Sequence, residues 1–247
     1  MPRVNDAVPQ GWTVVPQGDR ALLLVFGDGI AVEVGRRCAA AAAALRQAAI
    51  PGVTDVVPAF NSVAVHYQPR PSCSGAAFRQ LADEIESVLA CTLDARQAPA
   101  AGRQIEIPVC YGGQFGPDLD EVAAHCKLDA ADVIRLHSGQ SAYVFMLGFA
   151  PGAPYIGVHD KRLAIGRRPT PRTAVPAGSV AIANLQTMIY PNVSPGGWHI
   201  IGATPSILFD PAKTPSTLLA PGDTVRFVPV SSDEYLVLKQ EQEREQA

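Results

Sequence analysis

The first hundred residues alternate short apolar runs with longer segments of helical spacing. Residues 21–26 form an uninterrupted apolar run of the length of a buried strand, closed by Gly27-Asp28-Gly29. Over 30–50, apolar residues recur every three to four positions, which is typical of a helix packed on a sheet. Two more strand-like runs, 53–57 and 62–67, and a second amphipathic segment, 74–93, follow. The predicted order is therefore β-α-β-β-α.

This order needs one more strand to form a complete small sheet. We expect a strand near residues 12–16 or 104–109 to complete a ferredoxin-like sandwich, with two helices on one face of an antiparallel sheet. Residues 95–103 contain Pro, Gly and Ala without periodicity, as linkers do. We therefore predict an α+β N-terminal ferredoxin-like domain over 1–98 and a second domain over 103–247.

The second domain has a different pattern. Two short helices are predicted over 119–126 and 130–137, with Asp118 and Asp129 at their N-cap positions. Short strands separated by Pro and Gly follow, at 143–147, 179–183, 199–201, 206–209 and 224–228. Dense turns with little helix indicate a mainly β, closed or half-closed barrel whose rim loops carry any function.

Composition narrows the choice of partners and compartment. The 247 residues carry 20 Lys+Arg and 23 Asp+Glu, a formal net charge of -3, and neither sign forms a long run. This argues against a nucleic-acid or anionic-membrane surface. Because no apolar run has signal-peptide or membrane-spanning length, we expect a cytoplasmic protein. The five cysteines are scattered and never spaced as CxxC, so we expect small buried side chains and no metal site.

The segment 190–205 is the most unusual of the chain. Two prolines and Gly196-Gly197 exclude a helix or a central strand from its first half, so we predict a loop. The loop ends in Trp198-His199 before a β-branched pair, so that a shaped surface with a polar tip leads into a strand. The alternative is a Pro-Gly turn with Trp198 in the core.

Arginines and histidines of the second domain are the candidate chemical groups. Arg167, Arg168 and Arg172 offer guanidinium forks for a carboxylate or a phosphate, against the alternative of solvated loop arginines. His137 and His199 lie near the loops and can act as general acid or base, although His137 can equally cap a helix C-terminus. GxSxG, Walker, HExxH and GxGxxG motifs are absent, so no nucleotide site is predicted.

Short motifs spread over nearly the whole chain resemble one family. The motifs include Gly18-Asp19-Arg20-Ala21, Pro108-Val109-Cys110-Tyr111-Gly112-Gly113, Gly148-Phe149, Pro151-Gly152, Pro154-Tyr155, Pro171-Arg172, Val175-Pro176-Ala177-Gly178-Ser179-Val180, Gln186-Thr187, Ser194-Pro195-Gly196-Gly197-Trp198 and Pro221-Gly222-Asp223. They resemble the family of 5-oxoprolinase B subunits, also named for a sporulation kinase inhibitor and as allophanate hydrolase subunit 1. The same family corresponds to the first half of the carboxyltransferase domain of urea carboxylase.

The resemblance implies a cyclophilin-like β-barrel after the ferredoxin-like domain. It also implies a multi-subunit enzyme, in which this chain pairs with larger C-type and with A-type subunits to hydrolyse 5-oxoproline to glutamate. ATP would be used by the assembled complex and not bound by this chain alone. Activation of a lactam oxygen by phosphorylation requires groups that hold a carboxylate and a developing anion.

We interpret His199, Arg172 and His137 as the catalytic candidates. We expect Arg172→Ala and His199→Ala each to reduce the activity of the complex without loss of stability. The substrate-binding candidates are Phe149, Pro151, Gly152, Ser179, Gln186, Thr187, Tyr190, Ser194, Gly196, Gly197 and Trp198.

Four positions depart from the family pattern. Ala153 stands where Phe is usual, Gly166 for Pro, and Asn184 and Met188 for Gly. We expect these changes to reshape a pocket, so that the small cyclic amide bound can differ from 5-oxoproline.

Two other functions remain open from the sequence. One is a regulatory protein that inhibits a histidine kinase through its barrel, and the other is half of a urea-type carboxyltransferase. Neighbouring genes for A-type and C-type subunits favour the hydrolase, a kinase or sporulation locus favours the inhibitor, and a biotin carboxylase gene favours the transferase.

We predict that limited proteolysis cuts first between residues 95 and 103, because a linker without periodicity is the most accessible backbone of the chain. Mass spectrometry of the products should show two stable fragments. First cleavage within 140–205, or the absence of two stable fragments, contradicts this boundary.

Overall fold

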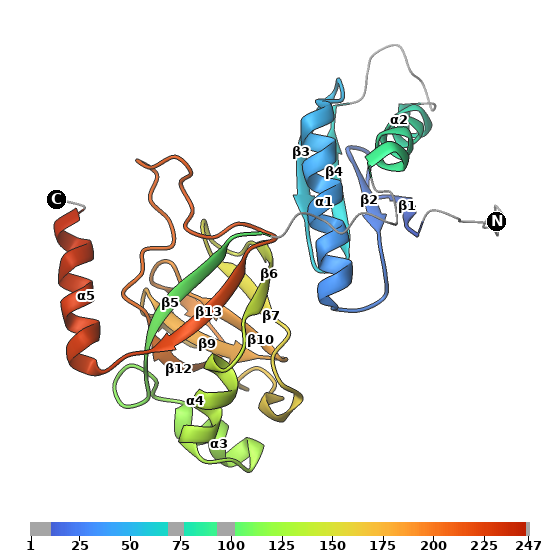
Figure 1. Cartoon of the computed structure of the whole chain (residues 1–247). Helices are drawn as coiled ribbons and strands as arrows, with labels where there is room; N and C mark the ends of the chain where they lie inside the picture. The colour runs from blue at the N-terminus through green and yellow to red at the C-terminus, as the bar shows by residue number, and fades with distance from the viewer. Residues whose placement is uncertain (1–10, 69–76, 93–101, 246–247) are drawn as a thin grey trace. The chain divides into compact units, whose positions relative to one another are not determined.

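The computed structural model comprises 247 residues, of which it describes 11–68, 77–92 and 102–245. The chain divides into two compact units, residues 1–100 and 101–247, each with its own hydrophobic core (Figure 1). The predicted linker, 95–103, lies outside the described residues except for its last two positions.

Unit 1 is an antiparallel sheet of four strands in the order β1-β2-β4-β3, with two helices. The elements are β1 (Thr13–Pro16), β2 (Ala21–Val25), α1 (Val32–Ala48), β3 (Val53–Pro58), β4 (Ser62–Tyr67) and α2 (Ala77–Thr92). The edge position beside β2 is taken by β1, the first of the two strands expected to complete the sheet. The turn at Gly18, whose φ is +71, folds β1 directly back onto β2.

The core of unit 1 follows from strand and helix periodicity. Leu22 and Leu24 of β2 and Val63 and Val65 of β4 are completely buried. They pack in one cluster with helix residues of α1 and α2, among them Cys38, Leu45, Ile85 and Leu89. Because every second residue of a strand points to the same face, these alternating positions build one continuous layer between sheet and helices.

Unit 2 is a closed barrel of seven strands in the order β10-β7-β6-β13-β5-β12-β9. The strands are β5 (Gln104–Tyr111), β6 (Ala142–Leu147), β7 (Pro154–Gly157), β9 (Ser179–Ala183), β10 (Gln186–Ile189), β12 (His199–Ala203) and β13 (Thr224–Pro229). The second half of the chain is therefore mainly β and contains a closed barrel, as predicted.

Two local features hold the barrel closed. Asn184 and Leu185 join β9 to β10 with φ values of 51° and 63°, the left-handed hairpin turn whose twist matches antiparallel strands. On the other side, β5 and β13 pair in parallel. Asp223, which precedes β13, accepts hydrogen bonds from Arg103 Nη2 at 2.6 Å and from the backbone nitrogen of Ala220 at 2.8 Å, so it fixes where this pair begins.

Helices and a ribbon surround the barrel. The helices α3 (Leu119–Cys126) and α4 (Ala130–Ser138) pack through Val122 and Val133 against Ile182 and Ile201 of the barrel wall. Figure 1 shows these two helices together at one end of unit 2 and α5 (Ser232–Glu245) apart from them. The remaining elements are the short 3-10 helix η1 (Lys161–Leu163) and a two-stranded ribbon of β8 (Arg172–Val175) and β11 (Ser194–Gly196).

Several predicted elements need correction. Residues 206–209 form no strand, only a single bridge between Phe209 and Thr217. The segment 194–196, predicted as loop, is β11. Strands β7, β8, β10 and β11 were not predicted because three or four residues interrupted by Pro or Gly are too short to show a period. Helix α5 is polar on most sides, and it is held by the Ser231–Glu234 capping box.

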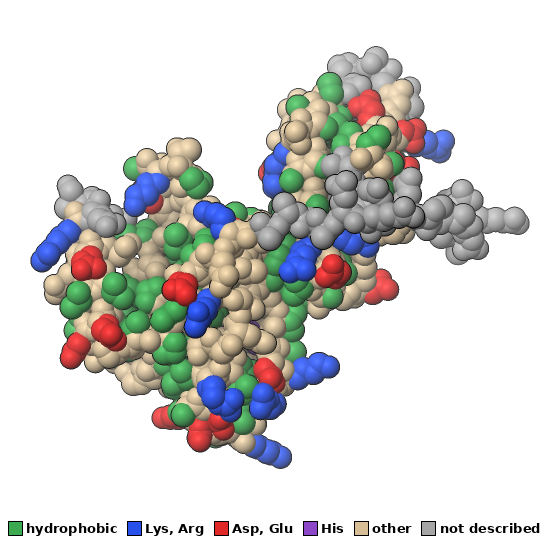
Figure 2. Space-filling view, in the orientation of Figure 1, with side chains coloured by type: hydrophobic (Ala, Val, Ile, Leu, Met, Phe, Trp, Pro, Cys, Tyr) green, Lys and Arg blue, Asp and Glu red, His purple; other side chains and the backbone are tan. Residues whose placement is uncertain are grey.

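The surface shows no concentration of one charge on the face in Figure 2, where basic and acidic side chains are interspersed. Within the described ranges, no helix is long and apolar enough to cross a membrane. Of the cysteines expected to be buried, Cys91 is exposed and Cys73 lies outside the described residues.

Candidate functional site

A buried carboxylate, Asp118, connects three segments of unit 2. Its side chain is 3% exposed and accepts from both terminal nitrogens of Arg172, at 2.8 and 2.7 Å, in fork geometry. Arg168 Nη1 donates to it at 3.0 Å and the backbone nitrogen of Ile200 at 2.7 Å. Burial alone would raise the pKa of Asp118, but the hydrogen bonds from Arg172 and Ile200 and the two arginine charges lower it below its ordinary value.

Arg172 therefore has its fork occupied within the protein, which corrects the expectation that this fork is free for a substrate. Sequence reasoning assigned Asp118 only to a helix cap. Asp118 does precede α3, but its side chain makes no capping hydrogen bond and reaches β8 instead. Arg168 is occupied in the same way, because its Nη1 also donates to Glu121 at 3.0 Å.

His199 lies beside this ion-pair cluster in the barrel wall. It is 4% exposed, and its Nδ1 is 3.9 Å from Glu121 Oε1, too far for a hydrogen bond. Burial lowers the pKa of His199, while the negative charges of Glu121 and Asp118 oppose that effect. The side chain is thus a buried, neutral imidazole, which corresponds to the structural alternative for this residue.

His137 belongs to a second, separate network inside unit 2. Its Nδ1 is 2.7 Å from Tyr111 Oη, and its Nε2 is 2.8 Å from Thr187 Oγ1. The same hydroxyl is 2.5 Å from His159 Nε2. His137 and Thr187 are completely buried, and the His137 ring stacks on Phe227 at 4.3 Å. The side chain of His137 therefore neither caps α4 nor reaches solvent.

This network is uncharged near neutral pH. Burial, followed by the neighbouring His159, holds the pKa of His137 well below 6.5, and burial lowers the pKa of His159 to about 4. Thr187 has one hydroxyl proton, so it donates to one imidazole and accepts from the other. The hydrogen bonds must therefore run in one direction along the chain of groups. His159 Nδ1, at the end of this series of hydrogen bonds, is buried and has no hydrogen-bond partner among the described residues.

An aromatic cluster connects the loops of the barrel rim. Tyr190 and Trp198 are buried, and Trp198 makes an edge-to-face contact with Tyr155 at 6.0 Å between ring centroids. A Cβ on Gly196 would lie 2.2 Å from Tyr190 Oη, so no side chain fits there. Gly197 has no such constraint, since the nearest atom is 3.6 Å away. The glycine at 196 is therefore explained by packing.

Arg167 is the loop arginine that stays without an acidic partner in the described part of the chain. Its side chain is exposed, and its Cζ lies 5.9 Å from the centroid of the Trp198 ring. Burial raises the pKa of Tyr155 and of Tyr190, and the positive charge of Arg167 opposes both shifts. The cation is thus within electrostatic reach of the aromatic cluster.

The loop 148–152 borders an open groove of about 470 Å³. The groove is lined by Leu147, Gly148, Phe149, Ala150, Pro151, Gly152, Phe209 and Thr217. It brings together three predicted substrate-binding residues, Phe149, Pro151 and Gly152. A Cβ on Gly152, whose φ is +78, would lie 2.8 Å from the Leu208 carbonyl oxygen, which explains this glycine.

The other predicted residues do not join one site. Ser179 and Gln186 are buried in strands, and the Ser194 hydroxyl donates to the Asn192 carbonyl at 3.4 Å. The site residues predicted from the sequence therefore lie in three separate places: the ion-pair cluster around Asp118, the buried network around His137, and the aromatic cluster at the barrel rim.

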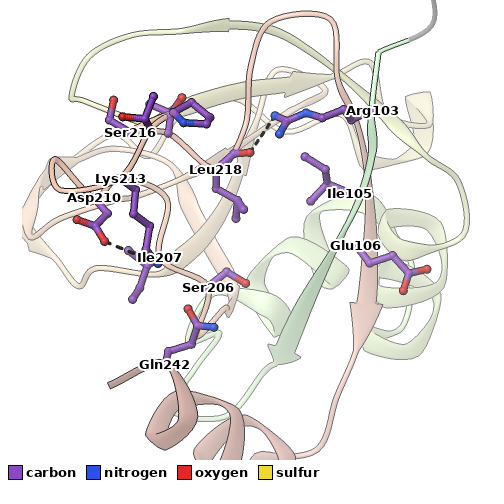
Figure 3. A pocket seen from close by; sticks show the side chains of 13 residues that line it. Arg103, Ile105, Glu106, Ser206, Ile207, Asp210, Lys213, Ser216, Leu218 and Gln242 are labelled. Atoms are coloured by element: carbon purple, nitrogen blue, oxygen red, sulfur yellow. Dashed lines mark hydrogen bonds and ion pairs between the residues drawn. The ribbon is translucent and has the colours of Figure 1, made fainter. Parts of the chain in front are cut away.

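A larger pocket, of about 520 Å³, has no predicted site residue in its lining and lies between the segment 206–218, the start of β5 and α5 (Figure 3). Its charged side chains are paired. Arg103 binds Asp223 and the Leu218 carbonyl, Lys213 lies 3.7 Å from Asp210, and Glu106 pairs with Arg226. The lining therefore offers no unpaired charge to select an ionic ligand.

Comparison with known proteins gives the family. The model of the carboxyltransferase domain, subdomain C and D, matches residues 12–219. The chain is 43% identical over 230 residues to the 5-oxoprolinase B subunit of Bacillus subtilis (strain 168), covering 91% of this chain and 95% of that protein. The chain belongs to the family of 5-oxoprolinase B subunits.

Solved structures agree with this family. The crystal structure of the protein TTHA0988 has a TM-score of 0.74 and 37% identity over 86% of this chain. The match spans only 40% of TTHA0988. The Kluyveromyces lactis urea amidolyase matches with a TM-score of 0.74 over 95% of this chain and 16% of its own, at 18% identity, which shows a common fold.

The four departures from the pattern of the B-subunit family have different surroundings. Ala153 and Met188 are buried, and Met188 packs in the cluster of Tyr190 and Trp198. Asn184 lies in the hairpin turn, where Asn tolerates a positive φ better than most residues. A Cβ on Gly166 would meet open space. Two of the four changes thus lie outside the core and do not reshape an interior.

Sequence reasoning missed several residues that the family fold brings together. Tyr111 and Tyr155 lay inside motifs shared with the family but received no role, and Glu121 and His159 lay in none. Their partners are far away in the chain, such as Thr187, 28 residues from His159. Thr187 itself was predicted as a substrate-binding residue, and the structure places its hydroxyl between His137 and His159.

We predict that Arg172→Ala destabilises unit 2 by about 1–3 kcal/mol, because it removes two donors from the buried carboxylate of Asp118. Urea denaturation of the full chain measures this. Arg162→Ala removes an exposed arginine paired with Asp160 and should leave the midpoint unchanged. Unchanged stability of Arg172→Ala together with lost activity of the complex would restore its catalytic role.

We predict that stability falls as the pH is lowered from about 6.5 to about 4. Unfolded His159 binds a proton with a pKa of 6.5, whereas the folded protein resists protonation down to about 4, so acid favours the unfolded state by on the order of 3 kcal/mol. Urea denaturation between about pH 7 and about 4.5 should show a smaller pH dependence for His159→Gln than for the wild type. His66→Gln, which removes an exposed imidazole, is the control. An identical pH dependence of His159→Gln and wild type contradicts the assignment.

Proposed function

We propose that this chain is a component of an ATP-dependent 5-oxoprolinase and that it acts together with C-type and A-type subunits. The observation that carries this proposal is the 43% identity to the 5-oxoprolinase B subunit of Bacillus subtilis over nearly the full length of both proteins. The likeness to urea amidolyase, at 18% identity, is one of fold and favours neither a carboxyltransferase nor a kinase inhibitor.

The domain assignment is part of the proposal. We infer a ferredoxin-like domain over residues 1–98 and a cyclophilin-like barrel over 103–247. The strand order β1-β2-β4-β3 with two helices supports the first, and the closed seven-stranded barrel supports the second. The position of the edge strand differs from a β-α-β-β-α-β order, since it comes from the N-terminal side of the domain.

This chain is proposed to bind no ATP alone and to act in the cytoplasm. The sequence has no phosphate-binding glycine loop, and two of the three candidate arginines are paired with carboxylates. Nucleotide use is therefore assigned to the assembled complex. The isolated chain should show neither ATPase nor 5-oxoprolinase activity, and ATP turnover by the isolated chain would overturn this assignment.

Arg167 is the residue that we propose for recognition of the substrate carboxylate. Asp118 and Glu121 offset the charges of Arg168 and Arg172, so the ion-pair cluster is close to neutral and Arg167 adds one positive charge. The exposed guanidinium lies over the buried Trp198 ring, and the half-buried Tyr155 is within reach of its charge, so an anionic group bound by Arg167 would lie beside an aromatic side chain. A cyclic amide with a carboxylate, such as 5-oxoproline, matches this combination.

We predict that Arg167→Ala raises the KM of the assembled complex for 5-oxoproline about tenfold or more, because a charge-assisted fork to the carboxylate is lost. Arg167→Lys, which keeps the charge without the fork, should give an intermediate KM. Arg162→Ala is the matched control, an exposed arginine of the same segment that pairs with Asp160. Steady-state assays of the reconstituted complex measure these values. A KM of Arg167→Ala equal to that of the control contradicts the assignment.

A further inference from the structure

Phe149 has a conformation and an exposure that packing inside this chain does not require. Its φ is +73, a region that bulky residues rarely adopt, and its side chain is 61% exposed. The ring makes an edge-to-face contact with Tyr190 at 6.4 Å. A glycine at this position would relieve the backbone strain. Because the Phe149 side chain is mostly exposed, this change would remove much less buried surface than the loss of a core side chain. An exposed aromatic ring held in a strained turn points to a role outside the folded chain.

The groove beside Phe149 has the chemistry of a site for apolar groups. Its lining contains no charged side chain, and its polar side chain is the hydroxyl of Thr217. Phe209, on the opposite border, is 36% exposed. A carboxylate placed in this groove would lose water without gaining a cation, which is unfavourable. The groove therefore fits an aliphatic or aromatic side chain better than a small polar substrate.

Further features of the rim match the composition of protein interfaces. Val193, three residues after the Tyr190 that Phe149 contacts, is 65% exposed. Aromatic residues are enriched in the energetically important centres of protein interfaces, and Phe149 and Phe209 are the aromatic residues of this groove. An exposed apolar surface of this sort on a barrel rim indicates a partner protein.

The lengths of two relatives fit a partner that is a separate polypeptide. The match covers 86% of this chain but only 40% of TTHA0988, so in that protein a homologous unit is joined to a longer stretch of polypeptide. The Bacillus subtilis protein is instead covered to 95%, which leaves no room for such a stretch. A counterpart of the additional stretch in proteins of that length would have to be a separate polypeptide. An apolar groove with an exposed aromatic rim is suited to that association.

We propose that the groove between loop 148–152 and Phe209 is the docking surface for the C-type subunit, which inserts an apolar side chain against the ring of Phe149. This inference rests on the proposed function, since the partner is the C-type subunit of the same complex. It places the partner beside the aromatic cluster of Tyr190 and Trp198, so the substrate site is completed at the interface between two chains.

The experiment uses isothermal titration calorimetry to measure the affinity of the full-length chain for its purified C-type partner. Phe149→Ala and Phe149→Gly should each raise the Kd at least about tenfold. Phe149→Gly should have a melting temperature equal to or above that of Phe149→Ala, because glycine removes the strain at φ +73. Leu236→Ala, which truncates an exposed apolar side chain on α5, is the matched control and should bind as the wild type does.

The outcomes separate this inference from the proposed function. Wild type that fails to bind the C-type partner overturns both. Wild-type affinity in both Phe149 variants overturns the docking surface and leaves the proposed function in place. Sedimentation equilibrium tests whether the groove instead binds a second copy of this chain. Self-association of the wild type that disappears in Phe149→Ala overturns the inference. Binding of 5-oxoproline to the isolated chain that is lost in Phe149→Ala also overturns it, in favour of a substrate subsite.

Discussion

The ion pair between Asp118 and Arg172 is the interaction on which the wall of the barrel depends. Asp118 lies before α3, Arg172 begins β8, and Ile200 is in β12, so a single buried carboxylate connects a helix, the outer ribbon and the barrel. A buried carboxylate is unfavourable unless donors surround it, and here two arginines and a backbone nitrogen do so. The segment before β8, which carries Arg167, also lies against the segment that carries Trp198, because the backbone nitrogen of Arg168 donates to the Gly197 carbonyl at 2.7 Å.

The polar residues of unit 2 fall into two groups: those whose hydrogen bonds and charges are satisfied inside the protein, and those that are exposed on the rim. The network of Tyr111, His137, Thr187 and His159 lies in the interior and is satisfied except at one imidazole nitrogen, so it specifies packing and is sensitive to acid. Interior groups with partners have little left to offer a ligand. The chemistry available for recognition lies on the rim, where Arg167 has no acidic partner in the described chain.

The rim combines two kinds of surface within a short distance. The exposed guanidinium of Arg167 is the group that we propose for an anionic ligand, whereas the groove beside Phe149 has an apolar lining that we propose for a side chain of a partner. A substrate bound at such a boundary would be enclosed only after the second chain docks. Exclusion of water by docking would strengthen the contact of Arg167 with a carboxylate. This arrangement would give a physical reason for the inactivity that we propose for the isolated chain.

The sequence by itself determined the periodic elements and the family. Helices α1 to α4 and strands such as β2 and β4 were predicted close to their observed bounds. The signals are local: helical spacing of apolar residues for α1 and α2, N-cap aspartates for α3 and α4, and short apolar runs for the strands. It did not determine which polar groups are free. Arg172 and Asp118 are 54 residues apart, and His137 and Thr187 are 50 residues apart. Such pairs are set by strand register and barrel closure, which carry no local periodicity, so only the tertiary structure showed that the fork of Arg172 binds Asp118 and that Arg167 has no acidic partner among the described residues.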